Sequence, residues 1–324
     1  MKRWVLAVVT LALAAGCGSE AAPTTSRYDV EFTVPQPVGA AVQEPTTTTG
    51  PEQAPCPDAL ASIRPPATLP PPGAMPAGST MAAIAQRGQL RVGVDQNTYG
   101  FGFRDSSSGD LEGFDIDVAR QMALAIFGDQ TKIQFVTMAS ADREPALMEG
   151  RVDMVVRTFT ITCDRKQRIN FSTVYFEAGQ QVLVNRGSEF RDLESLAGKR
   201  VCSASGSTSI GRLLNAAVPL TAVGVPNWTD CLVMLQQGQV DAVSTDDTIL
   251  AGLAAQDPNT EVVGGRFSDE PYGIGMPLQS PDLVAFVNGV LDRMRRDGTW
   301  AAIHQRWLSE LGPAPAPPTP RYLP

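Results

Sequence analysis

The sequence repeats one short pattern at two distant places, and this repeat constrains the fold more than any other feature. Residues 147–155 (LMEGRVDMV) are echoed by residues 235–243 (LQQGQVDAV). In each copy an apolar helix face ends at a glycine, Gly150 or Gly238, and a short β-branched run follows. A helix, a glycine stop and a buried strand form the repeating unit of α/β sheets. We therefore predict an α/β protein with two similar lobes.

The first copy leads into residues 157–172 (RTFTITCDRKQRINFS). Val152–Val156 predicts a buried strand, and Thr162 stands at the N-cap position of a helix that opens with Cys163. The carboxyl end of a strand lines the ligand crevice in open α/β sheets, and guanidiniums beside hydroxyls suit carboxylate oxygens. This end carries Arg157, Thr158, Thr160 and Arg165. An ordinary strand–turn–helix with solvated arginines explains the same residues.

When the two copies are aligned in sequence, Arg157 and Thr158 correspond to Thr245 and Asp246 of the second lobe. One lobe then offers a cation and the other an anion at equivalent strand ends. A zwitterion held between facing lobes would satisfy both charges.

Residues 157–172 resemble the signature of bacterial periplasmic solute-binding proteins of family 3, the polar amino-acid type, in which a T-x-T-x-x-R run clamps the α-carboxylate of the ligand. The resemblance covers Leu90 to Leu311. Its other motifs are LRVGVD (90–95), GFDIDVA (113–119), GKRVCSASGSTS (198–209), VDAVSTDD (240–247), YGIGMP (272–277) and GTWAAIHQRW (298–307). Within the family the chain is most similar to glutamine- or glutamate-binding lipoproteins of actinobacterial ABC transporters.

The resemblance implies the type 2 periplasmic-binding-protein fold, in which two lobes, each a mostly parallel sheet flanked by helices, are joined by two crossing strands. We expect lobe 1 at residues 81–183 and 270–312, and lobe 2 at residues 184–269. The crossings are predicted at residues 181–184 and 264–272.

The start of the chain has export features. A basic start and a short apolar run predict a signal peptide over residues 1–16, and the small residues before Cys17 resemble a lipoprotein box. Residues 18–80 hold 13 of the 26 prolines, which predicts a tether over 17–80, and a second proline-rich tail covers 313–324. We expect a lipid-anchored (palmitate-bearing) protein on the outer face of the cell membrane; simple secretion with a free Cys17 is the alternative.

Four cysteines remain once Cys17 is lipidated, and four can pair in three ways. Cys202 and Cys231 fall in the same predicted lobe, so we expect them to pair, which leaves Cys56 with Cys163. Free buried thiols are the alternative. No CxxC spacing indicates a metal site.

The resemblance assigns Arg165, Thr160 and Thr158 to the α-carboxylate, Asp246 to the α-ammonium, and Tyr99 to an aromatic wall against the ligand; Tyr99 could equally be packing. Ser207 and Thr208 precede a helix, so they are expected to meet the carboxylate from the second lobe, although a plain helix N-cap would look the same.

Arg157 is then left over as a second cation. A cation in a cleft favours a ligand with a side-chain carboxylate, so aspartate or glutamate is predicted, with asparagine or glutamine possible. If Arg157 instead pairs with Glu177 or Asp247, the site is neutral and prefers glutamine. Arg143 is expected to face solvent rather than the cleft.

The predicted function is an amino-acid receptor that delivers its ligand to an ABC permease, without a cofactor, without enzymatic chemistry, and as a monomer. A sensor that signals through another membrane receptor is one alternative. A dehydratase or lyase on the same fold is another, with Glu177 and Asp247 as the only candidate acid–base residues. A net charge of −8 disfavours nucleic acid as a partner, and the single histidine, His304, argues against a Ser-His-Asp triad or a histidine-rich metal site.

Overall fold

The computed structural model describes residues 34–44, 56 and 58–324. The predicted signal peptide and Cys17 lie outside these residues. Within the described ranges, no helix combines the length and the apolar character needed to cross a bilayer.

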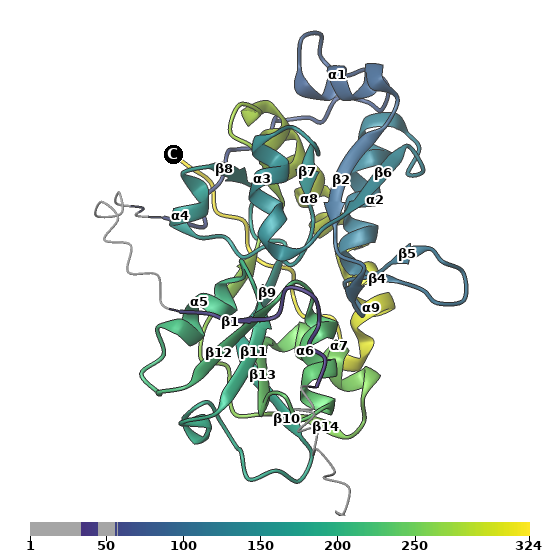
Figure 1. The fold of residues 1–324 in the computed structure, drawn as a ribbon. Helices are drawn as coiled ribbons and strands as arrows, with labels where there is room; N and C mark the ends of the chain where they lie inside the picture. Colours follow the sequence, from purple (N-terminus) through teal and green to yellow (C-terminus); the bar gives the residue numbers. More distant parts are fainter. Residues whose placement is uncertain (1–33, 45–55, 57) are drawn as a thin grey trace, which may run out of the picture. The chain divides into compact units, whose positions relative to one another are not determined.

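Two larger sheets carry most of the strands (Figure 1). The five-stranded sheet has the order β6-β2-β7-β16-β8, and the six-stranded sheet has the order β1-β12-β11-β13-β10-β14. Their strands are β6 (Ile133–Thr137), β2 (Leu90–Val94), β7 (Met154–Val155), β16 (Gly275–Pro277) and β8 (Ile169–Phe171), then β1 (Ala41–Val42), β12 (Thr221–Val225), β11 (Arg200–Ala204), β13 (Ala242–Asp246), β10 (Gln180–Asn185) and β14 (Thr260–Val263). Each sheet has a parallel centre, with β6-β2-β7 in one and β12-β11-β13 in the other, and antiparallel neighbours outside it.

The helices of the described residues are α1 (Thr80–Arg87), α2 (Phe114–Phe127), η1 (Ser140–Asp142), α3 (Arg143–Met148), α4 (Cys163–Lys166), η2 (Glu194–Leu196), α5 (Thr208–Leu214), α6 (Trp228–Gln236), α7 (Asp247–Gln256), α8 (Pro281–Asp297), α9 (Thr299–Leu308) and η3 (Ser309–Leu311). Two smaller sheets complete the fold: β3 (Asn97–Thr98), β4 (Gly102–Arg104) and β5 (Leu111–Glu112), and the pair β9 (Phe176–Ala178) with β15 (Glu270–Tyr272).

The repeated sequence pattern has one structural form in both sheets. Helix α3 ends before Gly150 and leads into β7, and α6 ends before Gly238 and leads into β13. Both glycines have positive φ, +67° and +65°, which a residue without a Cβ adopts without strain. Each strand that follows is hydrogen-bonded to a neighbouring strand along both of its edges. The α/β prediction is confirmed.

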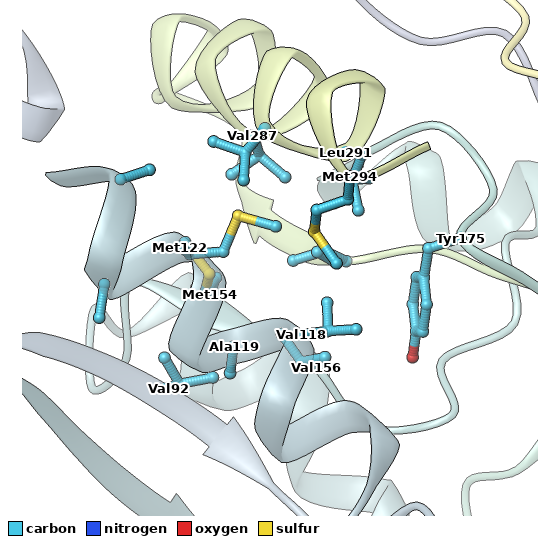
Figure 2. Packing of buried hydrophobic residues seen from close by; sticks show 14 of the residues in the cluster. Val92, Val118, Ala119, Met122, Met154, Val156, Tyr175, Val287, Leu291 and Met294 are labelled. Carbon is cyan, nitrogen blue, oxygen red and sulfur yellow. The ribbon is translucent and has the colours of Figure 1, made fainter. Parts of the chain in front are cut away.

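The largest buried cluster lies between the five-stranded sheet and helices α2, α8 and α9. Figure 2 shows Met122 of α2 packed near Met154 of β7 and near Val287 and Leu291 of α8. Two further clusters bury the six-stranded sheet against its helices. Burial of this apolar surface, at about 25 cal/mol per Å², is the main favourable contribution to folding.

The first crossing between the two sheets lies earlier in the chain than predicted. Residues 181–184 form part of β10, which pairs with β13 on one side and β14 on the other. Val182, Leu183 and Val184 are almost completely buried, as expected for a strand that is covered on both faces of its sheet. The first crossing is made instead by β9, which pairs antiparallel with β15. Strand β15 lies inside the segment predicted for the return crossing, residues 264–272.

Parts of the predicted proline-rich tether and tail are packed on the fold. Strand β1 pairs with β12 and covers that edge of the six-stranded sheet. Ile63, Leu69 and Met75 pack against the main cluster, and Tyr322 of the tail forms a backbone bridge with Ser62. The reason is that apolar side chains interrupt the prolines and have surface to bury.

Both expected disulfides are present. Cys56 is bonded to Cys163 with 5.7 Å between their Cα atoms, and Cys202 to Cys231 with 5.5 Å. These separations are usual for a disulfide. The Cys202–Cys231 bond joins β11 to α6. The Cys56–Cys163 bond joins the amino-terminal segment to the first residue of α4.

Candidate functional site

The segment after β7 turns sharply before it enters α4. Thr158 has a φ of 38°, unusual for a residue with a Cβ, and its amide donates to the buried carboxylate of Asp115 (2.9 Å). Thr162 is the N-cap of α4, since its Oγ1 accepts the amide of Arg165 (3.2 Å). The N-cap predicted from the sequence is confirmed.

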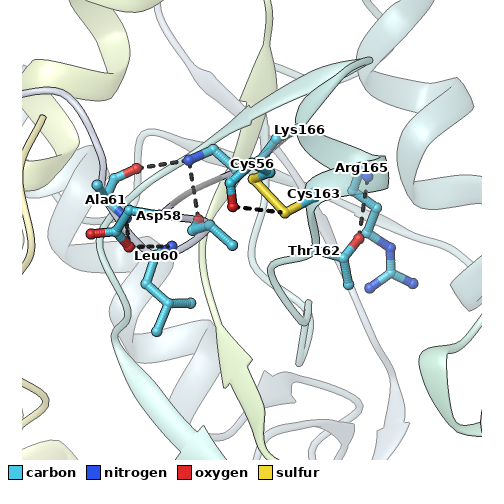
Figure 3. Close-up of a disulfide and its surroundings, with 9 residues drawn as sticks. Cys56, Asp58, Leu60, Ala61, Thr162, Cys163, Arg165 and Lys166 are labelled. Carbon is cyan, nitrogen blue, oxygen red and sulfur yellow. Dashed lines mark hydrogen bonds between the residues drawn. A yellow bond between two sulfur atoms is a disulfide. The ribbon is translucent and has the colours of Figure 1, made fainter. Parts of the chain in front are cut away.

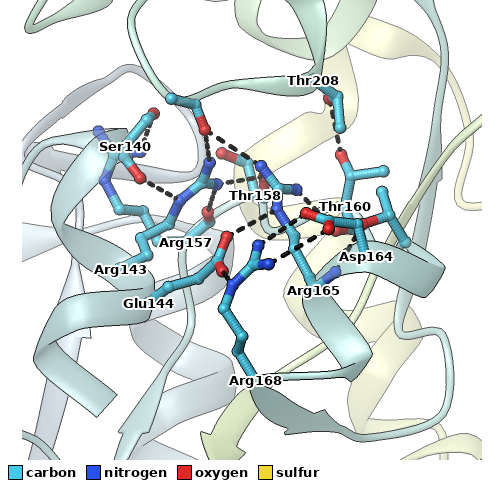
Figure 4. A network of polar contacts seen from close by, with 12 residues as sticks. Ser140, Arg143, Glu144, Arg157, Thr158, Thr160, Asp164, Arg165, Arg168 and Thr208 are labelled. Carbon is cyan, nitrogen blue, oxygen red and sulfur yellow. Dashed lines mark hydrogen bonds and ion pairs between the residues drawn. The ribbon is translucent and has the colours of Figure 1, made fainter. Parts of the chain in front are cut away.

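Arg165 reaches from α4 to the loop that follows β11 (Figure 4). Its guanidinium donates to the carbonyls of Thr160 (2.7 Å) and Gly206 (3.1 Å) and pairs with Glu144 (3.3 Å). The side chain is almost fully buried and lies over the ring of Phe159. Burial lowers the pKa of Arg165, and the charge of Glu144 opposes that shift.

Arg143 lies beside Arg165 and points to the same carbonyl. It is 3% exposed, so the expectation that it faces solvent is wrong. Its guanidinium donates to four carbonyls, those of Ser140 (2.9 Å), Arg157, Thr158 and Gly206 (each 3.3 Å). Among the residues that the structure describes, no carboxylate lies within ion-pair distance of it. Burial lowers the pKa of Arg143 well below its usual range, and Arg165 and Arg157 act in the same direction.

Arg157 is not a spare cation. It is fully buried, pairs with Asp95 (3.0 Å) and donates to the Met138 carbonyl (2.8 Å) and the Ser140 hydroxyl (2.7 Å). Its partner is therefore neither Glu177, which is exposed, nor Asp247, which pairs with Arg266. These contacts occupy the Arg157 guanidinium and neutralise its charge. Arg157 is therefore not available to bind a side-chain carboxylate of the ligand.

The loop after β11, a strand of the six-stranded sheet, contacts the guanidiniums of Arg143 and Arg165. The Gly206 carbonyl accepts from both Arg143 and Arg165, and Gly206 has a φ of +73°. A Cβ at this position would stand 2.6 Å from the Cα of Ala141, which real side chains do not tolerate. This close approach between η1 and the loop therefore requires glycine.

Ser207 and Thr208 have different roles in the structure. The Ser207 hydroxyl caps α5: it accepts the amide of Ile210 (3.1 Å) and donates to the Ala204 carbonyl (2.7 Å). This is the N-cap arrangement that the sequence left open as an alternative. Thr208 donates to Glu270 (2.7 Å) and lies 3.4 Å from the hydroxyl of Thr160. Thr160 and Thr208 thus meet between the two sheets, beside Arg165.

Asp246 ends β13 and is 3% exposed. It accepts the hydroxyl of Tyr272 and, more weakly, that of Ser209 (3.4 Å), and no cation in the described part of the chain pairs with it. Burial and, secondly, the nearby charge of Glu270 raise its pKa to about 7. The charge of Asp246 acts on both Arg143 and Arg165. An ionised carboxylate that is buried without a cation is costly, so a cation placed beside Asp246 would stabilise its ionised form.

Tyr99 is not brought to this cluster. It is 43% exposed, packs against Phe103 with 5.0 Å between ring centroids, and lines a separate cavity of about 340 Å³ with residues of α7 and α9. The neighbouring Thr98 is the buried residue of the loop, and its hydroxyl donates to Asp95 (2.7 Å).

The sequence reading missed Arg143, Asp95 and Glu270. Asp95 follows β2, whose carboxyl end meets that of β7, so the argument applied to Arg157 could have found it. Glu270 gave no local signal, because its partner Thr208 lies 62 positions earlier, and the contact of Arg143 with Gly206 spans 63 positions.

The family model of the bacterial extracellular solute-binding proteins, family 3, matches residues 90–310. The chain belongs to this family. It is 40% identical over 232 residues to the ABC transporter glutamine-binding protein GlnH of Bacillus subtilis (strain 168), spanning 71% of this chain and 85% of that protein. It is 32% identical over 245 residues to the glutamate-binding protein GluB of Corynebacterium glutamicum, spanning 72% and 81%.

Solved structures of similar proteins agree on the fold. An ancestral arginine-binding protein bound to glutamine superposes with a TM-score of 0.62 at 37% identity, covering 68% of this chain and 98% of that one. The solute receptor for L-cysteine of Neisseria gonorrhoeae superposes with a TM-score of 0.68 at 26% identity, covering 72% and 94%. The type 2 periplasmic-binding-protein fold expected from the resemblance is confirmed.

Proposed function

We propose that this family member is an exported, lipid-anchored receptor that binds one free amino acid and delivers it to an ABC permease. The observation that carries the proposal is the charge arrangement between the two sheets. Two buried guanidiniums, Arg143 and Arg165, converge on one side, and on the other no cation of the described residues pairs with the buried carboxylate of Asp246. An α-carboxylate and an α-ammonium complement these groups. The names of the relatives support the amino acid and the permease.

The ligand is proposed to be glutamate or glutamine, with aspartate and asparagine as shorter candidates. Arg165 takes the α-carboxylate, in agreement with the family motif. Among the described residues, the hydrogen-bond acceptors of Arg143 are all neutral carbonyls. Arg143 therefore takes the role first predicted for Arg157 and binds the side-chain oxygen of the ligand. A carboxylate gains more than a carboxamide from a guanidinium, because a hydrogen bond between two charged groups is about twice as strong as a neutral one.

We further propose that the protein carries out no chemistry on its ligand. The two carboxylates considered as acid–base residues do not serve: Glu177 is exposed on β9, and Asp247 is held by Arg266. The lipid anchor rests on the sequence around Cys17 alone.

Calorimetric titration of the purified protein with the common amino acids tests the proposal. Glutamate and glutamine should bind most tightly, and mass spectrometry should recover them unchanged. In Arg143→Met, loss of a charge-assisted bond of about 1.5–3 kcal/mol should weaken glutamate at least tenfold, while the neutral bond to glutamine, about 0.5–1.5 kcal/mol, should cost less. Arg104→Met, at an exposed arginine of β4, is the matched control.

The ligand assignment fails if a basic amino acid binds most tightly, or if Arg143→Met weakens glutamate and glutamine equally. The receptor proposal itself fails if no amino acid binds, or if the ligand is converted.

A further inference from the structure

Helix α4 is a single turn of four residues, yet it carries Arg165. A helix of this length is not stable by itself in water, because nucleation fixes several dihedral angles for one hydrogen bond. The direction of the Arg165 side chain therefore depends on what holds α4 from outside.

The amino-terminal segment holds one side of α4 (Figure 3). Cys163, the first residue of the helix, is bonded to Cys56. Lys166, the last residue, donates through Nζ to the carbonyls of Ala59 (3.1 Å) and Ala61 (2.7 Å). Both ends of the turn are thus fixed to one segment that lies more than 100 residues earlier in the chain.

That segment is itself held by the carboxyl-terminal tail and by α8. Ser62 exchanges two backbone hydrogen bonds with the tail: its amide donates to the Arg321 carbonyl (2.9 Å), and its carbonyl accepts the amide of Leu323 (2.8 Å). Asn288 of α8 donates to the Ser62 hydroxyl (2.8 Å) and the Ile63 carbonyl (2.7 Å). We call Cys56 and residues 58–63, together with residues 321–323, the clasp.

The Ser62 hydroxyl also links the clasp to the five-stranded sheet, because it donates to the carbonyl of Phe171 in β8 (2.7 Å). Strand β8 follows α4 directly. The clasp therefore contacts α4 at its first and last residues and also the strand that follows it. Its link to the first residue of α4 is covalent, through the Cys56–Cys163 disulfide.

We propose that the clasp sets ligand affinity by positioning α4, with Lys166 and the Cys56–Cys163 disulfide as the positioning elements for Arg165. The inference rests on the proposed function, since it takes Arg165 as the group that binds the α-carboxylate. Neither Lys166 nor the disulfide touches the ligand in this arrangement. Their effect is to remove the cost of ordering the turn from the binding step.

The experiment compares four variants of the purified full chain with the wild type: Lys166→Met, Lys166→Arg, Cys56→Ala with Cys163→Ala, and the matched control Lys132→Met at an exposed lysine. Two quantities are measured well below the melting temperature of each variant. One is the Kd for glutamate and glutamine by calorimetry, and the other is hydrogen exchange of the backbone amides of residues 163–168.

Lys166→Met and the double cysteine variant should each raise Kd about threefold to tenfold, the range expected for ordering one or two side chains on binding. Exchange should speed up in residues 163–168 and remain unchanged in β2 and β13. Lys166→Arg keeps a donor that reaches both carbonyls, so it should restore most of the affinity, and Lys132→Met should resemble the wild type.

A purely structural clasp would give the opposite pattern. If the variants melt earlier but keep Kd within twofold and exchange in residues 163–168 unchanged, the inference is overturned. If the wild type binds no amino acid, the proposed function fails, and the exchange data alone then decide whether the clasp orders α4.

Discussion

Asp246 ends β13 beneath the hydroxyl of Tyr272, with no cation beside it among the described residues, and burial raises its pKa to about 7. A ligand ammonium requires the ionised carboxylate, so protonation of Asp246 should compete with binding. With a pKa of about 7, the free protein is about 90% ionised at this residue at pH 8 and about 1% ionised at pH 5. The Kd should therefore rise about 90-fold between pH 8 and pH 5, which corresponds to about 2.7 kcal/mol.

Calorimetric titration with glutamine over this pH range measures the effect, because the glutamine side chain does not titrate. At pH 6, repeating the titration in two buffers with different ionisation enthalpies should show release of about 0.9 proton per ligand bound. Asp246→Asn should bind weakly at pH 8 and lose the pH dependence. A wild-type Kd that stays within threefold from pH 5 to pH 8 would show that Asp246 does not receive the ammonium.

The stability of the free protein should depend on pH in the opposite direction to ligand affinity. A carboxyl group whose folded pKa lies above its unfolded value of 3.8 contributes stability that is fully present below pH 3.8 and is lost as the pH rises to about 7. Asp115 shares this behaviour, since burial also raises its pKa to about 7. Free protein should thus become less stable from pH 4 to pH 7 by chemical denaturation, and Asp246→Asn should flatten part of that slope.

Arg165→Ala should weaken binding by about 2–5 kcal/mol, at least thirtyfold by calorimetry, because it leaves a buried ligand carboxylate unpaired; a Kd within threefold of wild type would exclude Arg165 as the clamp. Ligand contacts to both sheets should draw them together, so the radius of gyration from small-angle X-ray scattering should fall on saturation, and an unchanged profile would contradict the assignment of Arg165 and Asp246 to facing lobes. Gly206→Ala should oppose that closure through about 1–2 kcal/mol of left-handed strain and the collision with Ala141, whereas Gly211→Ala, with open space around it, should close normally. Mass spectrometry of unreduced protein should find no free thiol in the four paired cysteines, and an alternative pairing would refute the two bonds.

The sequence by itself determined the local elements. Gly150 and Gly238 stop helices and precede buried strands in both copies of the repeat, and Thr162 caps the turn that carries Arg165. These features depend on residues within about ten positions of one another, where helical periodicity, glycine dihedral angles and capping hydrogen bonds act. The family motif likewise lies in one continuous stretch, so the fold could be predicted before the structure was known.

The tertiary structure alone decided which charges are satisfied. Arg157 was predicted to be free and is paired with Asp95. Arg143 was predicted to face solvent and is buried, with no carboxylate partner in the part of the chain that the structure describes. The same holds for the proline-rich segments predicted as a tether and a tail, which meet at Ser62. The partner of a charged or backbone group is set by distance in space, and the sequence gives no distance between residues 60 or 260 positions apart until the sheets have assembled.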